Sequence, residues 1–259
     1  MDVNKNSYTI VFATILVVVV ASLLSTASIV LKSYQSKNIE QEKKQNILKS
    51  IGVQVTREQA EIDYPNYIKE ELVVDYLGKI QEGSAFDIDL SKELRKEIDQ
   101  QSYPVYIAEI LGEIKYIIPL RGKGLWGPIW GFIALNDDLN TVSAAVFDHK
   151  AETPGLGAEI NRPFFQDPFK GKKIMEDGKF VSIKVQKGGA NGDIHKVDGI
   201  SGGTITSDGV TEMIDERLSR YLPYFKSISK EIQVQEVLNA VDFDEQMDTV
   251  SNINERIID

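Results

Sequence analysis

The chain has 259 residues, a formal net charge of −10 at pH 7 and no cysteine. The acidic balance excludes a role that depends on binding a nucleic-acid backbone, because that role requires clustered Lys and Arg. The lack of cysteine excludes disulfides, thiolate-bound zinc and cysteine-ligated iron–sulfur clusters, so redox chemistry would need an organic cofactor or a metal held by other ligands. Because the two histidines, His149 and His195, are far apart in sequence, we expect no zinc or non-haem iron site.

Residues 9–31 are the first predicted element, a single transmembrane helix preceded by the short segment 1–8. The run from Thr9 to Leu31 contains no charged residue, and about 20 apolar residues in a helix span the hydrocarbon core of a bilayer. A cleaved signal peptide is the alternative, because Ser25–Ala27 has the small residues of a cleavage site. The apolar run continues past those residues, which favours the membrane anchor. The span contains no carboxylate that could bind a cation inside the membrane.

Lysines are concentrated after the span, which is the usual mark of a cytoplasmic side. One lysine precedes the span and four follow it closely: Lys5 before, then Lys32, Lys37, Lys43 and Lys44. Long domains can nevertheless cross the membrane against such a bias. The sequence alone therefore leaves the orientation of the chain open.

Residues 32–100 are predicted to form a helical linker and the first part of the soluble domain. One helix is expected from Asn38 to about Ser50, where it leaves the membrane. A second is expected from about Asn66 to Gly78, because its apolar residues recur at helical spacing. A third, shorter helix is expected from Ser91 to Gln100, with Ser91 as its N-cap. We interpret the carboxylates of this region as surface groups.

Residues 101–226 are predicted to form the main domain, in which strands replace helices. The predicted strands are short, rich in Ile, Val and aromatic residues and separated by turn residues; they cover residues 105–110, 113–120, 129–135, 142–148 and 180–186. Leu111–Gly112 and Asn136–Asp138 are the predicted turns. Strands flanked by helices indicate an α+β fold with a mainly antiparallel sheet. Residues 227–259 form an acidic tail, in which Glu231 to Val241 has helical spacing.

The stretch from Asp198 to Ser207 places a glycine pair among several hydroxyls, directly before an amphipathic segment. Thr206 or Ser207 is the predicted N-cap of that helix, and Pro223 is the predicted end. The first N–H groups of a helix have no partner inside it and lie at its positive end, where they can hold a phosphate. The alternative is an ordinary Ser/Thr-Gly turn before a capped helix.

This stretch resembles the D-x-x-[ST]-G-A-T pattern of the covalent FMN-binding domain family. That family includes the C subunit of the sodium-translocating NADH:quinone oxidoreductase and the G subunit of the Rnf complex. The resemblance implies that a flavin transferase moves FMN from FAD onto Thr204 as a phosphoester. The chemistry of the stretch alone leaves Ser201, Thr206 and Ser207 open as competing hydroxyls. The matching residues are Asp198, Ser201, Gly202 and Thr204, and Gly203 stands where the family usually has alanine.

Three further segments resemble the same family: Gly122–Gly127 (G-x-G-L-W-G), His149–Gly157 (H-x-x-E-T-P-G-L-G) and Lys187–Ala190. The resemblance implies that Lys187 places a positive charge near the N1–O2 edge of the flavin, where it would stabilise the anionic reduced form. On composition alone, Trp126 could instead be a core residue, Thr153–Gly155 an ordinary turn and Lys187 a solvated lysine. The other flavin-pocket residues that the resemblance implies are Leu125, Trp126, Glu152, Thr153, Gly155 and Leu156.

The resemblance implies an electron-carrier subunit that holds FMN and has no catalytic side chains of its own. The sequence contains no Ser-His-Asp arrangement, no nucleophile elbow and no phosphate loop that ends in Lys-Ser/Thr. Other subunits would oxidise NADH and reduce quinone, with this chain anchored in the inner membrane by one span and its soluble domain in the periplasm. Two alternatives are the equivalent subunit of an Rnf ferredoxin:NAD oxidoreductase and a non-redox, membrane-anchored binding domain without flavin.

Overall fold

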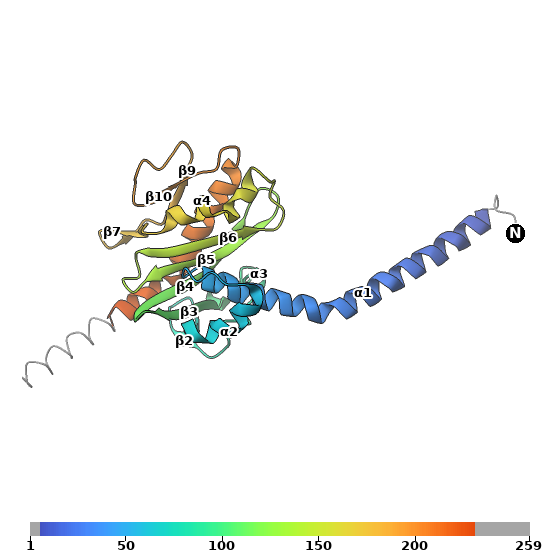
Figure 1. Ribbon diagram of the computed structural model, residues 1–259, viewed down its shortest axis with the longest axis horizontal. Coiled ribbons are helices and arrows are strands. Elements are labelled where there is room, and N and C mark those ends of the chain that lie inside the picture. Colours follow the sequence, from blue (N-terminus) through green and yellow to red (C-terminus); the bar gives the residue numbers. More distant parts are fainter. Residues whose placement is uncertain (1–5, 231–259) are drawn as a thin grey trace, which may run out of the picture.

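The computed structural model describes residues 6–230, beginning with the long helix α1, Asn6–Lys49. Its 44 residues give a length of about 66 Å at 1.5 Å per residue. The most apolar 18-residue window has a mean hydropathy of 2.6, and none of it is buried in the protein. Figure 1 shows α1 projecting away from the folded domain. The helix is therefore long and apolar enough to cross a membrane, and its continuation through residues 38–49 confirms the helix predicted there.

Six antiparallel strands form the main sheet, in the order β2-β1-β3-β4-β5-β6. Leu111 and Gly112, between β3 and β4, both have positive φ angles of 52° and 85°, as a two-residue hairpin turn of type I′ requires. The α+β fold with a mainly antiparallel sheet is confirmed. The strands are β1 Ile68–Val74, β2 Ile80–Gln81, β3 Tyr103–Ile110, β4 Glu113–Lys123, β5 Pro128–Asn136 and β6 Val142–His149.

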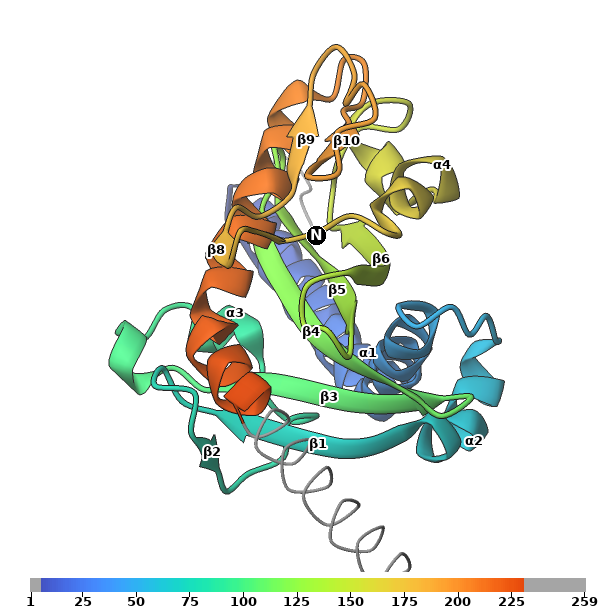
Figure 2. The ribbon, with the colours of Figure 1, turned by 90° about the vertical axis from the view of Figure 1, so that its left-hand side faces the viewer.

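Helices cover both faces of this sheet, as Figure 2 shows. The helix over residues 204–230 packs on one face, where it buries Met213 and Leu218 in one cluster with Leu120 of β4. The end of α1 and the helix α2, Arg57–Tyr67, pack on the other face with Ile47 and Tyr64. Because both faces are covered, the central strands β4 and β5 are buried on both sides.

The predicted helix from Asn66 to Gly78 is wrong, because most of this segment is β1. Val73 of β1 pairs with Pro104 of β3 and Leu72 with Val105. The apolar residues of the segment fit either period, but β-branched residues at its end favour a strand, and pairing with β3 fixes it as one. The sheet therefore begins before residue 101.

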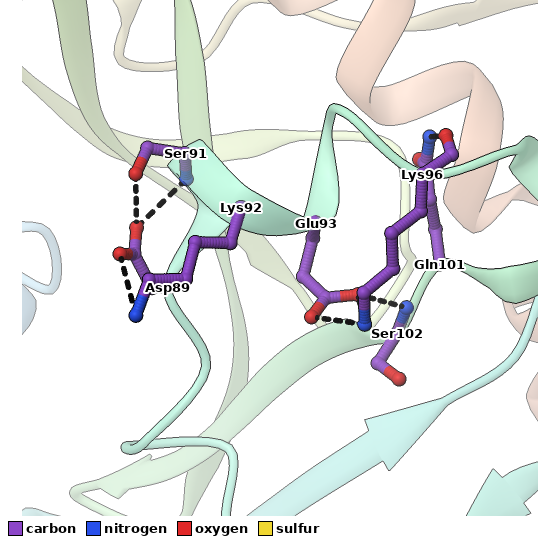
Figure 3. Close-up of polar contacts among 7 residues, drawn as sticks. All are labelled: Asp89, Ser91, Lys92, Glu93, Lys96, Gln101 and Ser102. Atoms are coloured by element: carbon purple, nitrogen blue, oxygen red, sulfur yellow. Dashed lines mark hydrogen bonds and ion pairs between the residues drawn. The ribbon is translucent and has the colours of Figure 1, made fainter.

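A single helix from Ser91 to Gln100 with Ser91 as its cap is also wrong. Figure 3 shows that the cap is Asp89, whose carboxylate accepts hydrogen bonds from the Ser91 N–H at 2.8 Å and the Ser91 hydroxyl at 2.6 Å. Glu93 accepts a bond from the Ser102 N–H at 3.0 Å, which ties the segment to the start of β3. Two short helices result: α3, Leu90–Glu93, and η1, Ile98–Gln100.

The helix that begins at residue 204 continues through Pro223, where we predicted its end, to residue 230. Tyr221, Tyr224 and Phe225 are all buried around the proline. Burying each large side chain contributes about 1.5–3 kcal/mol, which together offsets the cost of about 3 kcal/mol for an internal proline. The segment Glu231 to Val241, predicted to be helical, lies outside the described residues.

The chain between β6 and this helix consists of short elements. The predicted strand over residues 180–186 is interrupted because Ser182 has a φ of 63°, outside the strand region. β9 and β10 pair in parallel, so Asp198 lies beside Gln186. The elements are η2 Gly157–Asn161, α4 Pro163–Gln166, η3 Asp167–Phe169, β7 Met175–Glu176, β8 Lys179–Phe180, β9 Lys184–Gln186 and β10 Lys196–Asp198.

Candidate functional site

The turn over residues 199–203 leads directly into the helix that starts at residue 204. Gly202 has a φ of 76°, in the left-handed region that favours glycine, and the Gly203 N–H donates to the Ile200 carbonyl at 3.0 Å. Within the described part of the chain, the N–H groups of residues 204, 205 and 206 have no acceptor. The helix start therefore presents three free donors and the positive end of a helix dipole, which suits an anion.

The four hydroxyls of this stretch differ sharply in access. Thr206 is 1% exposed and donates to Glu152 Oε2 at 2.6 Å. Ser207 is 2% exposed, and its Oγ accepts from the Ile200 N–H at 3.2 Å. Both residues lie inside the first turn, so the prediction that either is the N-cap is wrong. Thr204 is partly exposed and Ser201 is exposed, and neither side chain forms a hydrogen bond with another described residue.

The segment after β4 and the segment after β6 lie side by side at one end of the sheet. The strand register fixes this, because Gly122 pairs with Ile129, and Ile129 pairs with His149. The first segment contains Trp126 and the second contains Glu152. The fold therefore brings together two of the motifs that the sequence separates.

Glu152 joins these two segments to the start of the helix. Its side chain is buried, with Oε1 accepting from the Trp126 N–H at 2.9 Å and Oε2 accepting from the Thr206 hydroxyl. Its own N–H donates to His149 Nδ1 at 3.2 Å. One carboxylate thus connects the β4–β5 loop, the loop after β6 and the helix start.

Glycines provide the clearance for this contact. A Cβ added at Gly124 would lie 2.5 Å from Glu152 Oε1, and one added at Gly157 would lie 2.5 Å from Oε2. A Cβ at Gly202 would lie 2.6 Å from Leu156 Cδ2. The three segments therefore approach too closely for larger residues at these positions.

Apolar side chains around this contact are left open to solvent. Trp126 is 65% exposed, which excludes its interpretation as a core residue, and Leu125 and Leu156 are also exposed. Ile205, at the second position of the helix, is exposed in the same way. Exposed apolar residues that surround free backbone donors are suited to bind a ligand with a flat apolar part and an anionic part.

Thr153 and Gly155 shape the loop after β6. The Thr153 carbonyl accepts from the N–H groups of Leu156 and Ala158, each at 3.1 Å. Gly155 has a φ of 76°, and its N–H donates to Glu159 Oε1 at 2.9 Å. The Thr153–Gly155 turn is therefore real, and it holds Leu156 toward the glycine pair.

Asp198 ends β10 and Lys187 follows β9, and the parallel pairing of β9 with β10 brings these two segments together. Asp198 Oδ1 accepts from the Ala190 N–H at 2.5 Å, which ties the glycine-rich loop after β9 to the end of β10. Lys187 is exposed at the start of that loop, and its ammonium forms no ion pair within residues 6–230. No group of metal-binding side chains is present in the described part of the chain.

Comparison with known proteins identifies the family. Residues 124–219 match the model of the FMN-binding domain. The C subunit of the Na(+)-translocating NADH-quinone reductase of Vibrio alginolyticus is 34% identical over 212 residues, which cover 74% of this chain and 82% of that protein. The chain belongs to the family of these C subunits. The corresponding protein of Vibrio anguillarum is also 34% identical, over 83% of this chain and 90% of its own length.

Solved structures from the same family have the same fold. The C subunit from Parabacteroides distasonis superposes with a TM-score of 0.71 at 46% identity, covering 75% of this chain and 96% of that one. NqrC of Shewanella oneidensis gives a TM-score of 0.63 at 26% identity, over 74% and 98% of the two chains. The resemblance predicted from the motifs is confirmed, and the chain is a subunit of an oxidoreductase complex.

Two residues of the candidate site were missed by sequence reasoning as site residues. Ile205 lies on the exposed side of an otherwise amphipathic helix, and that exception to the pattern was the available signal. The sequence indicates Thr206 only as a cap or a competing hydroxyl. Its bond to Glu152 joins residues 54 positions apart in sequence, and no local pattern indicates such a contact.

Proposed function

We propose that this chain carries FMN as a phosphoester on Thr204 and relays electrons within a sodium-translocating NADH:quinone reductase. The observation that carries the proposal is an accessible threonine hydroxyl at a helix start with three free N–H donors. Those donors suit the phosphate, and the exposed side chains of Leu125, Trp126 and Leu156 suit the isoalloxazine ring. The residues present therefore fit the cofactor that the family implies.

Attachment requires a flavin transferase as a partner and FAD as the donor. The Thr204 oxygen forms a new bond to the phosphorus of the FMN half, the bond between the two phosphates of FAD breaks, and AMP leaves with the hydroxyl proton. The burial and hydrogen bonds of Thr206 and Ser207 support Thr204 over these two hydroxyls. Asp198 would serve attachment by fixing the loop before the turn, since its carboxylate already accepts the Ala190 N–H.

Bound FMN supplies one- and two-electron transfer, and the side chains hold and tune it. Trp126 and Leu156 would exclude water from the ring, while Thr153 and Gly155 hold Leu156 in place through the turn that they form. Lys187 would add positive charge near the pyrimidine side of the ring. Electrons would enter and leave through other subunits of the complex, so this chain needs no catalytic residue of its own.

We place residues 9–31 of α1 in the inner membrane lipid and the folded domain, including the end of α1, in the periplasm. The lysines after the span favour the cytoplasm by the charge rule, but long domains cross the membrane largely regardless of that charge. Lys43 Nζ donates to the Phe86 carbonyl and lies 4.4 Å from the centre of the Phe86 ring. Lys44 pairs with Glu40 at 2.8 Å. Two of the four lysines thus have a role in the folded domain, which accounts for their presence on either side of the membrane.

Mass spectrometry of the full-length chain, co-expressed with a flavin transferase, tests the attachment. The wild-type chain should gain the mass of FMN less one water, on a peptide that contains residues 201–207. Thr204→Ala should abolish this gain, whereas the matched variant Ser201→Ala should retain it. Loss of the modification in Ser201→Ala with retention in Thr204→Ala would assign the flavin to Ser201, and an unmodified wild-type chain would refute covalent attachment.

A further inference from the structure

Glu152 is a buried carboxylate without a cationic partner. Its side chain is 4% exposed, and no Lys, Arg or His within residues 6–230 forms an ion pair with it. Its partners are neutral donors, the Trp126 N–H and the Thr206 hydroxyl. Burying such a group is costly unless nearby dipoles stabilise the charge. The start of the 204–230 helix supplies one such dipole.

The surroundings are shaped for both carboxylate oxygens. Gly124 leaves room for Oε1 and Gly157 leaves room for Oε2, since a Cβ at either position would lie 2.5 Å from the respective oxygen. A Cβ at Gly157 would also lie 2.3 Å from the Thr206 hydroxyl oxygen. Two different segments of the chain thus avoid side chains where the carboxylate lies, so its position is specified from both sides.

We propose that Glu152 is a positioning residue that also sets the reduction potential of the site. Through its two bonds it fixes Trp126, on one side of the site, relative to the start of the helix that bears Thr204. Its negative charge, buried beside the same site, opposes the addition of electrons to a bound flavin and lowers the reduction potential. The charge effect rests on the proposed flavin function, whereas the positioning effect applies equally to the chain without flavin.

The low exposure of the carboxylate is the reason to expect a measurable effect on the potential. Charges in water are screened, but a charge removed from solvent acts over several ångströms with a lower effective dielectric. Asp208, also in the first turns of the helix but exposed, provides the comparison. The two carboxylates have the same formal charge, but Glu152 is buried and Asp208 is exposed.

Three variants of the full-length protein separate charge from position. Glu152→Gln keeps the shape without the charge: its amide oxygen can accept from the Trp126 N–H, and its amide nitrogen can donate to the Thr206 hydroxyl oxygen. Glu152→Ala removes both the charge and the contacts, and Asp208→Asn removes an exposed charge. Flavin loading is measured by mass, and the potential by redox titration of the loaded protein. The exposure of Trp126 is measured by acrylamide quenching of the unloaded protein in a Trp130→Phe background, because the chain has two tryptophans.

Glu152→Gln should shift the equilibrium of two-electron reduction at least tenfold toward the reduced flavin, which is a rise of about 30 mV in the reduction potential. Its acrylamide quenching of Trp126 should equal that of the wild type. Asp208→Asn should shift it less than threefold, and Glu152→Ala should increase quenching of Trp126. An unchanged potential in Glu152→Gln with normal loading would overturn the charge effect and leave the proposed function intact. Unchanged quenching in Glu152→Ala would overturn the positioning effect. A wild-type chain that takes no flavin would refute the proposed function and the charge effect together, with the quenching still deciding the positioning effect.

Discussion

Replacing Gly202 by alanine should destabilise the protein and disturb the candidate site at its contact with Leu156. The φ of 76° at Gly202 costs an L-residue about 1–2 kcal/mol. The added Cβ would also lie 2.6 Å from Leu156 Cδ2. Leu156 is exposed and can move aside, so we expect the backbone cost to dominate. A loss of about 1–2 kcal/mol in the free energy of unfolding lowers the melting temperature of a domain of this length by about 2–8 °C.

The adjacent Gly203→Ala variant is the matched control for this prediction. Gly203 has no positive φ, and its added Cβ would lie 3.0 Å from Ile200 Cγ2, a contact that small shifts can relieve. The lower entropy of the unfolded chain offsets part of the cost of alanine at a helix start. Thermal unfolding of both full-length variants in detergent should show a clear loss for Gly202→Ala and little change for Gly203→Ala. Equal melting temperatures, or a larger loss in Gly203→Ala, would refute the reasoning.

Two further predictions concern orientation and pH. Glu82 is exposed, and Glu82→Cys would introduce the only thiol of the chain. A membrane-impermeant maleimide should label this variant in intact spheroplasts. Labelling only after lysis would place the domain in the cytoplasm. Burial raises the pKa of Asp138, but hydrogen bonds from the Thr141 hydroxyl and the N–H groups of Thr141 and Asn140 outweigh it, so the pKa lies below its usual value. This stabilisation is complete above the unfolded pKa of about 3.9 and is lost as pH falls through the folded value. Asp138→Asn should therefore lower the melting temperature more at pH 7 than at pH 2. An equal decrease in melting temperature at both pH values would contradict this prediction.

The strands of the central sheet could be predicted because their signals are local. β-branched and aromatic runs identified β3 to β6, and Leu111–Gly112 marked a turn that needs two positive φ angles. The first strand could not be predicted in this way. Ile68 to Val74 fits both the helical and the strand period, and only its pairing with β3 decides between them. That pairing depends on residues 29 to 40 positions away in the sequence, from Val74 with Tyr103 to Ile68 with Ala108.

The last helix continues past a proline because the packing of neighbouring aromatic residues outweighs the local tendency of proline to end a helix. A proline at position 223 normally ends a helix. Here the aromatic residues on both sides of it are buried against the sheet, and Gly78 allows the backbone to come close. A Cβ at Gly78 would lie 2.3 Å from the Tyr224 nitrogen. Tertiary packing thus preserves a helix that the local rule would end.

Two of the motif glycines in the candidate site are needed for space and not for a positive φ angle. Glycine in a loop usually indicates a positive φ, and Gly155 and Gly202 have one. Gly124 and Gly157 do not; each leaves space for one oxygen of Glu152. The tryptophan motif and the Glu-Thr-Pro-Gly motif are therefore two halves of one contact, completed by Thr206. A substitution at either glycine should act through Glu152, even though the two positions lie in different loops.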